Sequence, residues 1–205
     1  MSNRSYENLI KEHYDRCFYE SQTSTKAKKD IVGVNYEYIR RVWIKDNGLD
    51  VATKEEKEKF KKMFGGTYDA DQYIVDPSSR TLLALEEDKG HYVDKCFFKR
   101  ALINFVETIA YCLKNKIEVP YFILSCPTKY SGYGEQMQYL LDELQLFNDK
   151  VTNICKEKIK FFHQCVHGRV GRTKYLTRRE TPFTIDEQLV KNEQDFFSML
   201  RRAEK

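Results

Sequence analysis

The sequence lacks the features of a membrane protein or an exported protein. No apolar run in its 205 residues approaches the length needed to cross a bilayer. The first residues, MSNRSYENLIKEHYDR, contain no apolar segment of the kind that signal peptides carry. We therefore expect no membrane partner and a cytoplasmic location.

Closely spaced cysteine pairs are also missing. The six cysteines include no C-x-x-C pair, and several lie in apolar stretches, which is typical of buried free thiols in a reducing compartment. His163, Cys165 and His167 alternate along a strand candidate, so they would share a face that could bind zinc. Because no nearby residue suggests a fourth ligand, we favour the alternative of a strand whose polar residues face outward.

Repeats, low-complexity tracts and clear interdomain linkers are absent as well. The chain is 41% hydrophobic and 14% aromatic, which is enough for a packed core and argues against wholesale disorder. A net charge of +4 is mild and does not by itself indicate a nucleic-acid partner. We predict a single α/β domain over residues 1–205, with a central mixed β-sheet flanked by helices.

Hydrophobic periodicity predicts a helical region over residues 1–66. Apolar and aromatic residues form one helical stripe from Tyr6 to Phe18, and a polar linker follows at 21–30. Residues 36–43 fit either a second helix or a strand. A capping box at Thr53 opens a charged helix that reaches Phe64, where two glycines end it.

Residues 127–205 read as an elaboration around further helices and one strand. Leucine and methionine at helical spacing predict a helix over 135–147, and an apolar run predicts a strand over 159–166. A second capping box, Thr184 to Glu187, predicts the start of a C-terminal helix.

The most informative stretch runs from Asp71 to Lys89 and predicts a β-hairpin. The sequence DPSS at 76–79 has the chemistry of a tight turn, with apolar strand candidates on both sides. Glu87 and Lys89 are two residues apart, so their side chains leave the same face of the second strand. The hairpin brings Asp71 toward that face, and clustered carboxylate oxygens are what Mg²⁺ binds.

Asp71 followed by Glu87-Asp88-Lys89 resembles the Asp…(Asp/Glu)-x-Lys signature of the PD-(D/E)XK nuclease superfamily, which includes most type II restriction endonucleases. A helix candidate at 96–113 and a buried strand candidate at 121–126 follow in the order of that superfamily's core. The resemblance covers residues 69–126. It implies a restriction-endonuclease-like core at 67–126, made of the catalytic hairpin, a helix and a strand, after an added helical N-terminal region.

The resemblance also implies roles for these residues in metal-assisted phosphodiester hydrolysis. Asp71 and Glu87 would bind Mg²⁺, and the backbone carbonyl of Asp88 would complete the set of ligands. Lys89 would orient the attacking water or offset the charge that develops on the phosphate.

Other acidic residues near the signature have alternative readings. Asp69 lies on the same strand face as Asp71 and is the fallback for the first metal ligand. Glu86 and Asp88 point to the opposite face and are expected to be bystanders, unless a one-residue bulge exchanges the faces. Glu37 and Glu107 are candidates for the helix-borne carboxylate that some members of the superfamily use; surface charge is the alternative for both.

Basic residues gather in the segment HGRVGRTKYLTRRE. Arginine and lysine neutralise phosphates, and arginine can also bind a guanine edge in the major groove. A solvated loop is the alternative for this segment, and the better one for KAKK at 26–29. We expect DNA contacts from Arg169, Arg172, Lys174, Arg178 and Arg179.

The resemblance and the basic segment together favour a Mg²⁺-dependent, site-specific endonuclease of double-stranded DNA, of the type II restriction kind. Such enzymes usually act as homodimers, because a two-fold symmetric protein matches a palindromic site. One alternative is a structure-specific repair or recombination nuclease. Another is a catalytically silent DNA-binding domain of the same fold, against which the intact Asp71, Glu87 and Lys89 argue.

Overall fold

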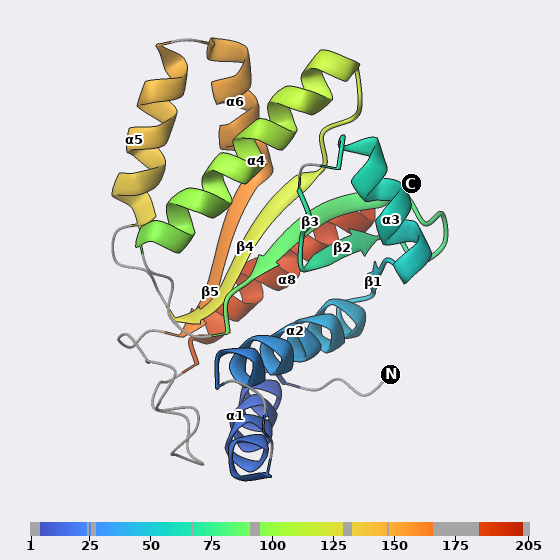
Figure 1. Cartoon of the computed structure of the whole chain (residues 1–205), viewed down its shortest axis with the longest axis vertical. Coiled ribbons are helices and arrows are strands. Elements are labelled where there is room, and N and C mark those ends of the chain that lie inside the picture. Colours follow the sequence, from blue (N-terminus) through green and yellow to red (C-terminus); the bar gives the residue numbers. More distant parts are fainter. Residues whose placement is uncertain are drawn as a thin grey trace.

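The computed structural model describes residues 5–23, 25, 28–66, 68–90, 95–128, 133–146, 148–165 and 185–202. Within these residues the protein has seven helices and a five-stranded mixed sheet, which confirms the expected α/β class (Figure 1). The order of the strands in the sheet is the same as their order in the sequence.

The helices are α1 (Tyr6–Thr23), α2 (Lys28–Asp46), α3 (Lys54–Met63), α4 (Lys95–Asn115), α5 (Tyr133–Gln145), α6 (Asp149–Lys158) and α8 (Glu187–Arg202). The strands are β1 (Asp50–Val51), β2 (Gln72–Val75), β3 (Leu82–Asp88), β4 (Tyr121–Thr128) and β5 (Ile159–Cys165).

Strands β1, β2 and β3 pair antiparallel, and β4 and β5 then extend the sheet in parallel. Helix α4 provides the long crossover that a parallel neighbour of β3 requires. In the hairpin Gln72 pairs with Glu86 and Tyr73 with Leu85, and the register shifts only beyond Ile74, at the turn end. The bulge therefore does not exchange the faces of the residues at the other end of β3.

Apolar residues on the two faces of the sheet build two separate cores. Helices α1, α2 and α8 pack on the face that carries Ile74 and Ala84. Helices α4, α5 and α6 pack on the face that carries Tyr73 and Leu85, and Figure 1 shows α4 and α8 on opposite sides of the sheet. Because both faces are covered, neighbouring residues of one strand are buried together.

The structure confirms several expected elements and corrects others. The capping box is present: Glu56 N donates to Thr53 Oγ1 over 3.3 Å, and Thr53 N donates to Glu56 Oε2 over 2.7 Å. Residues 36–43 are helical. The bounds of the polar linker expected at 21–30 are too wide, because α1 extends to Thr23 and α2 begins at Lys28. Helix α8 begins at Glu187 rather than after Thr184, since the Asp186 carboxylate caps its first turn.

Four cysteines, Cys17, Cys112, Cys126 and Cys155, are buried free thiols as expected, but Cys96 is exposed on α4. The basic residues from 169 to 179, the side chain of Cys165 and all of His167 lie outside the described residues. No described helix combines the length and the apolar character that crossing a membrane requires.

Candidate active site

The hairpin turn is built by the side chain of Asp76. Its Oδ1 atom accepts hydrogen bonds from Ser78 N over 2.9 Å and from Ser79 N over 2.7 Å, as its turn chemistry predicts. The turn then directs β3 back along β2 in the observed register. The far end of the hairpin consequently brings the start of β2 and the end of β3 together.

Asp71 and Glu87 are close neighbours at that far end. The Asp71 Oδ2 atom accepts a hydrogen bond from Asp88 N over 2.7 Å, and Glu87 Oε2 accepts one from the Tyr68 hydroxyl over 3.0 Å. Burial raises the pKa of Asp71 to about 7, and the charge of Glu87 contributes to this rise. Burial also raises the pKa of Glu87, although the bond from Tyr68 opposes the shift. The two carboxylates therefore repel each other in a partly dehydrated place.

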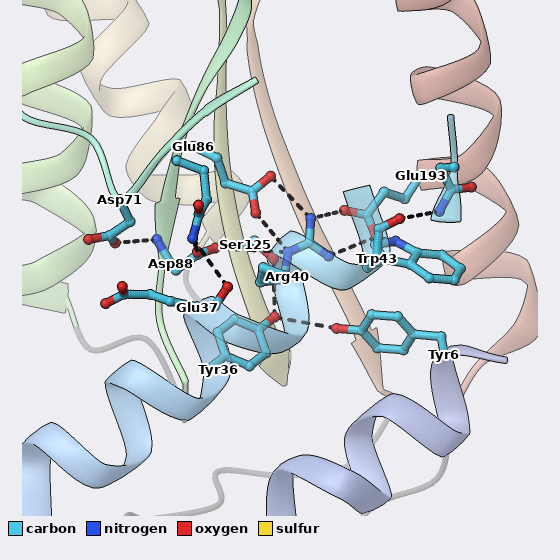
Figure 2. Close-up of polar contacts among 12 residues, drawn as sticks. Tyr6, Tyr36, Glu37, Arg40, Trp43, Asp71, Glu86, Asp88, Ser125 and Glu193 are labelled. Carbon is cyan, nitrogen blue, oxygen red and sulfur yellow. Dashed lines mark hydrogen bonds and ion pairs between the residues drawn. The ribbon is translucent and has the colours of Figure 1, made fainter. Parts of the chain in front are cut away.

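A third carboxylate, Glu37 of α2, lies beside this pair. Figure 2 shows Glu37 next to Asp71, and Gln72 Nε2 donates to the Glu37 backbone carbonyl over 3.2 Å. After burial, the Glu37 charge is among the causes that raise the pKa values of Asp71 and Glu87. Of the two helix-borne candidates the structure thus brings Glu37 to the pair, whereas Glu107 is exposed on α4.

Two positive charges stand on the α4 side of Glu87. The Lys89 Nζ atom lies 4.2 Å from the centre of the Phe97 ring, and the Arg100 guanidinium carbon lies 5.6 Å from the same centre. Burial raises the pKa of Glu87, and the charges of Arg100 and Lys89 lower it in part. Arg100 was not among the expected site residues, because its effect on Glu87 depends on how α4 packs against the sheet and no local pattern marks it.

Asp69 is held away from this cluster. Its carboxylate pairs with Lys57 over 3.1 Å and with Lys61 over 2.9 Å, both on α3. Partial burial works in the other direction, but these two lysines lower the pKa of Asp69. Its side chain is 48% exposed, whereas Asp71 is bonded to the backbone of β3. This arrangement favours Asp71 over Asp69 as the first candidate ligand.

Glu86 points to the opposite face of β3, as expected, but it is not a bystander. Arg40 of α2 donates to both of its oxygens, from Nε over 2.7 Å and from Nη2 over 3.1 Å. Arg40 also donates to Glu193 of α8, which accepts a further bond from Trp43 Nε1 over 3.1 Å. Figure 2 shows Arg40 between Glu86 and Glu193. The side chains of these three residues are all 0% exposed.

Asp88 connects the two faces of β3. Its backbone N–H bonds to Asp71 on the side of the acidic cluster, and its carboxylate accepts from Gln72 Nε2 over 3.0 Å. The Arg40 Nε atom lies 3.9 Å from Asp88 Oδ1. Burial and the neighbouring Glu86 raise the pKa of Asp88 well above its usual range. Asp88 is therefore part of the same buried network as Arg40.

The acidic cluster has the donor chemistry of a magnesium site, but it is an open one. Among the described residues, no three His, Cys, Asp or Glu side chains lie close enough together to bind one metal ion. Mg²⁺ is usually held by one or two carboxylates, with water and substrate phosphate in the other positions. Asp71 and Glu87 fit that pattern with the carbonyl of Asp88 as a candidate third donor, and a bound cation would oppose the rise in carboxyl pKa that burial and, to a smaller extent, neighbouring negative charge cause.

No protein-family model and no solved structure matches the chain. Its fold and geometry define an α/β protein with an acidic cluster at the open end of a β-hairpin, beside the parallel strand β4.

Proposed function

We propose that this protein is a Mg²⁺-dependent DNA endonuclease. The observation that carries the proposal is the meeting of Asp71 and Glu87 beside Lys89 and Arg100 at the open end of the hairpin. The hairpin is followed by a helix and then by a strand parallel to its second strand, which is the order in the PD-(D/E)XK core. This order and the signature residues support the superfamily proposal together.

In this proposal Asp71, Glu87 and the Asp88 carbonyl would hold the metal, and Glu37 contributes only its nearby negative charge. A Mg²⁺ ion bound there supplies Lewis-acid chemistry, which polarises a phosphate and makes hydroxide available near neutral pH. The Asp88 N–H bond orients the Asp71 carboxylate, and the Tyr68 hydroxyl orients that of Glu87. Both carboxylates are thus fixed in direction by the protein.

The positive groups act on the substrate. Lys89 offsets charge on the reacting phosphate or orients the attacking water. Arg100 binds a phosphate of the same strand, because its planar guanidinium can donate two hydrogen bonds to one phosphate. The shared contact with Phe97 keeps both side chains on the Glu87 side of α4.

Within the nucleases we propose a type II restriction enzyme that acts as a homodimer on double-stranded DNA. The basic segment, with Arg169, Arg172, Lys174, Arg178 and Arg179, supplies DNA contacts in this proposal, and its composition supports that role.

Incubation of a defined phage DNA with the purified chain and Mg²⁺, followed by mapping of the ends, tests the proposal. Discrete fragments with fixed ends are expected. The Asp71→Asn variant, purified in the same way, controls for contaminating nucleases and should leave the DNA intact. Trimming from free ends or cleavage of junctions would indicate a repair nuclease instead. A chain that cuts no DNA with either Mg²⁺ or Mn²⁺ contradicts the proposal.

A further inference from the structure

We propose that Gly90 is a positioning residue, whose bare backbone packs directly on helix α2 and thereby sets the place of Lys89. Lys89 directly follows the end of β3. This role of Gly90 rests on the proposed function, in which Lys89 acts in cleavage. Helices α1 and α2 then have a task in the active site, because they hold the end of β3 from the face opposite α4.

Lys89 and Gly90 face opposite sides at the end of β3. The Lys89 Nζ atom lies 4.2 Å from the centre of the Phe97 ring of α4. Gly90 is buried against α2, where a Cβ atom added to it would lie 2.7 Å from the Val32 carbonyl oxygen and 2.8 Å from the Tyr36 Cβ atom. Neither of these atoms is the end of a flexible side chain that could turn away. An alanine here would therefore push the chain away from α2.

Space, rather than backbone conformation, is what requires glycine at this position. The φ angle of Gly90 lies outside the left-handed range that favours glycine, so only the close approach of the two backbones excludes a side chain. Gly33 of α2 is the opposite case, although it is the neighbour of Val32. Among the described residues, no packed neighbour lies within 4 Å of a Cβ atom added to Gly33.

Hydrogen bonds hold the same point from two further directions. The Lys89 backbone N–H donates to the Ser125 carbonyl of β4 over 2.9 Å, and the Ser125 hydroxyl lies 3.1 Å from the Tyr36 hydroxyl (Figure 2). The Gly90 carbonyl accepts from Nε2 of the buried His13 of α1 over 3.4 Å. Elements α1, α2, α4 and β4 thus all contact the two residues that end the hairpin.

A small displacement at this point matters for the chemistry. Parting Gly90 and α2 from 2.7 Å to an ordinary contact of 3.4 Å requires a shift of about 0.7 Å at an added Cβ atom. A misplacement of about 1 Å at a reacting group can cost about 100-fold in rate. The neighbouring Lys89 would move with the backbone, and its ammonium group would leave its place beside Phe97 and Glu87.

Nuclear magnetic resonance of the lysine side chains tests the position of Lys89 without any DNA or metal. Reductive methylation with ¹³C-formaldehyde labels the lysines and keeps their charge, and Lys89→Arg identifies the Lys89 signal by its loss. In the parent, the Phe97 ring should shift this signal upfield. We expect Gly90→Ala to lose most of that shift and Gly33→Ala to keep it.

Cleavage by the same two variants tests the consequence. Gly90→Ala should lower the single-turnover rate with Mg²⁺ by about tenfold or more, yet leave DNA affinity in Ca²⁺ within about twofold, because the change acts on the chemical step. Gly33→Ala should cut at the parental rate. A parental Lys89 signal or a parental cleavage rate in Gly90→Ala overturns the role of Gly90 while leaving the nuclease function.

Melting curves check the folding of each variant. If Gly90→Ala does not fold, His13→Leu replaces it, because this change removes the bond to the Gly90 carbonyl but keeps an apolar side chain in the core. The Lys89 signal should then move in the same direction, and an unchanged signal overturns the role of Gly90. A parent chain that cuts no DNA overturns the proposed function and this inference together.

Discussion

The two faces of strand β3 hold their carboxylates in opposite ways. Glu86 is fully buried, and both of its oxygens accept bonds from Arg40. Its neighbour Glu87 is only partly buried, accepts one bond from the Tyr68 hydroxyl, and stands beside another carboxylate, Asp71. A charge that is matched by a buried partner serves the fold, whereas carboxylates that repel each other at a partly open place are a mark of a functional site.

The largest expected effect comes from neutralising the acidic cluster. Glu87→Gln and Asp71→Asn should each lower the rate of Mg²⁺-dependent cleavage by about 100-fold or more, because each removes a carboxylate ligand of the proposed metal. Both should melt at pH 8 no lower than the parent, since a neutral amide removes the repulsion within the cluster. Single-turnover cleavage and thermal melting of the same preparations measure the two effects.

Asp69→Ala is the control for this pair. Its carboxylate is held by Lys57 and Lys61, so the variant should cut at close to the parental rate. If Asp69→Ala does not cut DNA while Asp71→Asn still does, the first metal ligand is Asp69 rather than Asp71.

On the Glu86 face of β3, removal of a carboxylate should instead lower the stability of the fold. Glu86→Ala leaves the buried Arg40 with one partner fewer, and we expect a loss of about 3–5 kcal/mol in the free energy of unfolding. Urea unfolding of Glu86→Ala and Glu87→Ala, side by side, measures the contrast. If Glu87→Ala proves to be the more destabilising change, the division between the two faces is wrong.

A smaller effect is expected from pH. Asp71 has a pKa of about 7 in the folded chain, above its ordinary value near 3.8, so the folded state holds a proton that the unfolded state has lost between these values. Metal-free stability should therefore fall as the pH rises from about 4 to about 7. Over the upper part of this range Mn²⁺ affinity should rise by up to about tenfold per pH unit, because binding displaces one proton.

Urea unfolding and Mn²⁺ titration at four values between pH 5 and pH 8 measure both trends. In Asp71→Asn, the decline in stability over this range should be reduced. An identical decline in the variant and the parent would show that another group carries the titration.

The smallest effect is expected from two adjacent cations of α4. Arg100 lies beside Phe97 and affects Glu87, whereas Lys99 Nζ lies 5.9 Å from the centre of the Tyr139 ring of α5. Arg100→Ala should weaken DNA binding in Ca²⁺ and reduce the log–log salt slope by about one, as expected for one lost phosphate contact. Lys99→Ala should change neither. Equal salt slopes for the two variants would show that Arg100 does not contact a DNA phosphate.

Local patterns were sufficient to predict the hairpin and its neighbours. The turn chemistry at 76–79 and the apolar runs on each side predicted β2 and β3, and a two-residue period placed Glu87 and Lys89 on one face. The same period placed Asp69 and Asp71 on one face of the strand, so it could not show which of the two is the first candidate metal ligand. In the structure Lys57 and Lys61 of α3 pair with Asp69 and hold it away from Glu87. That contact depends on tertiary packing, so the sequence alone did not reveal it.

The buried network was not predictable from the sequence for the same reason. Arg40 is separated from Glu86 by 46 residues and from Glu193 by 153, and each of them reads locally as an ordinary surface charge. Local periodicity shows which face of an element a residue occupies. It does not show which distant element covers that face, and the roles of Glu86 and Arg40 depend on that.

Direct counting of bound Mn²⁺ tests the central claim, which is that the metal site is on the Glu87 face of β3. Electron paramagnetic resonance reports free Mn²⁺ during titration of the parent, Asp71→Asn, Glu87→Gln and Asp69→Ala, without any DNA. We predict saturable binding by the parent and by Asp69→Ala, and none by the other two. No saturable binding by the parent, or equal binding by Glu87→Gln, would contradict the account.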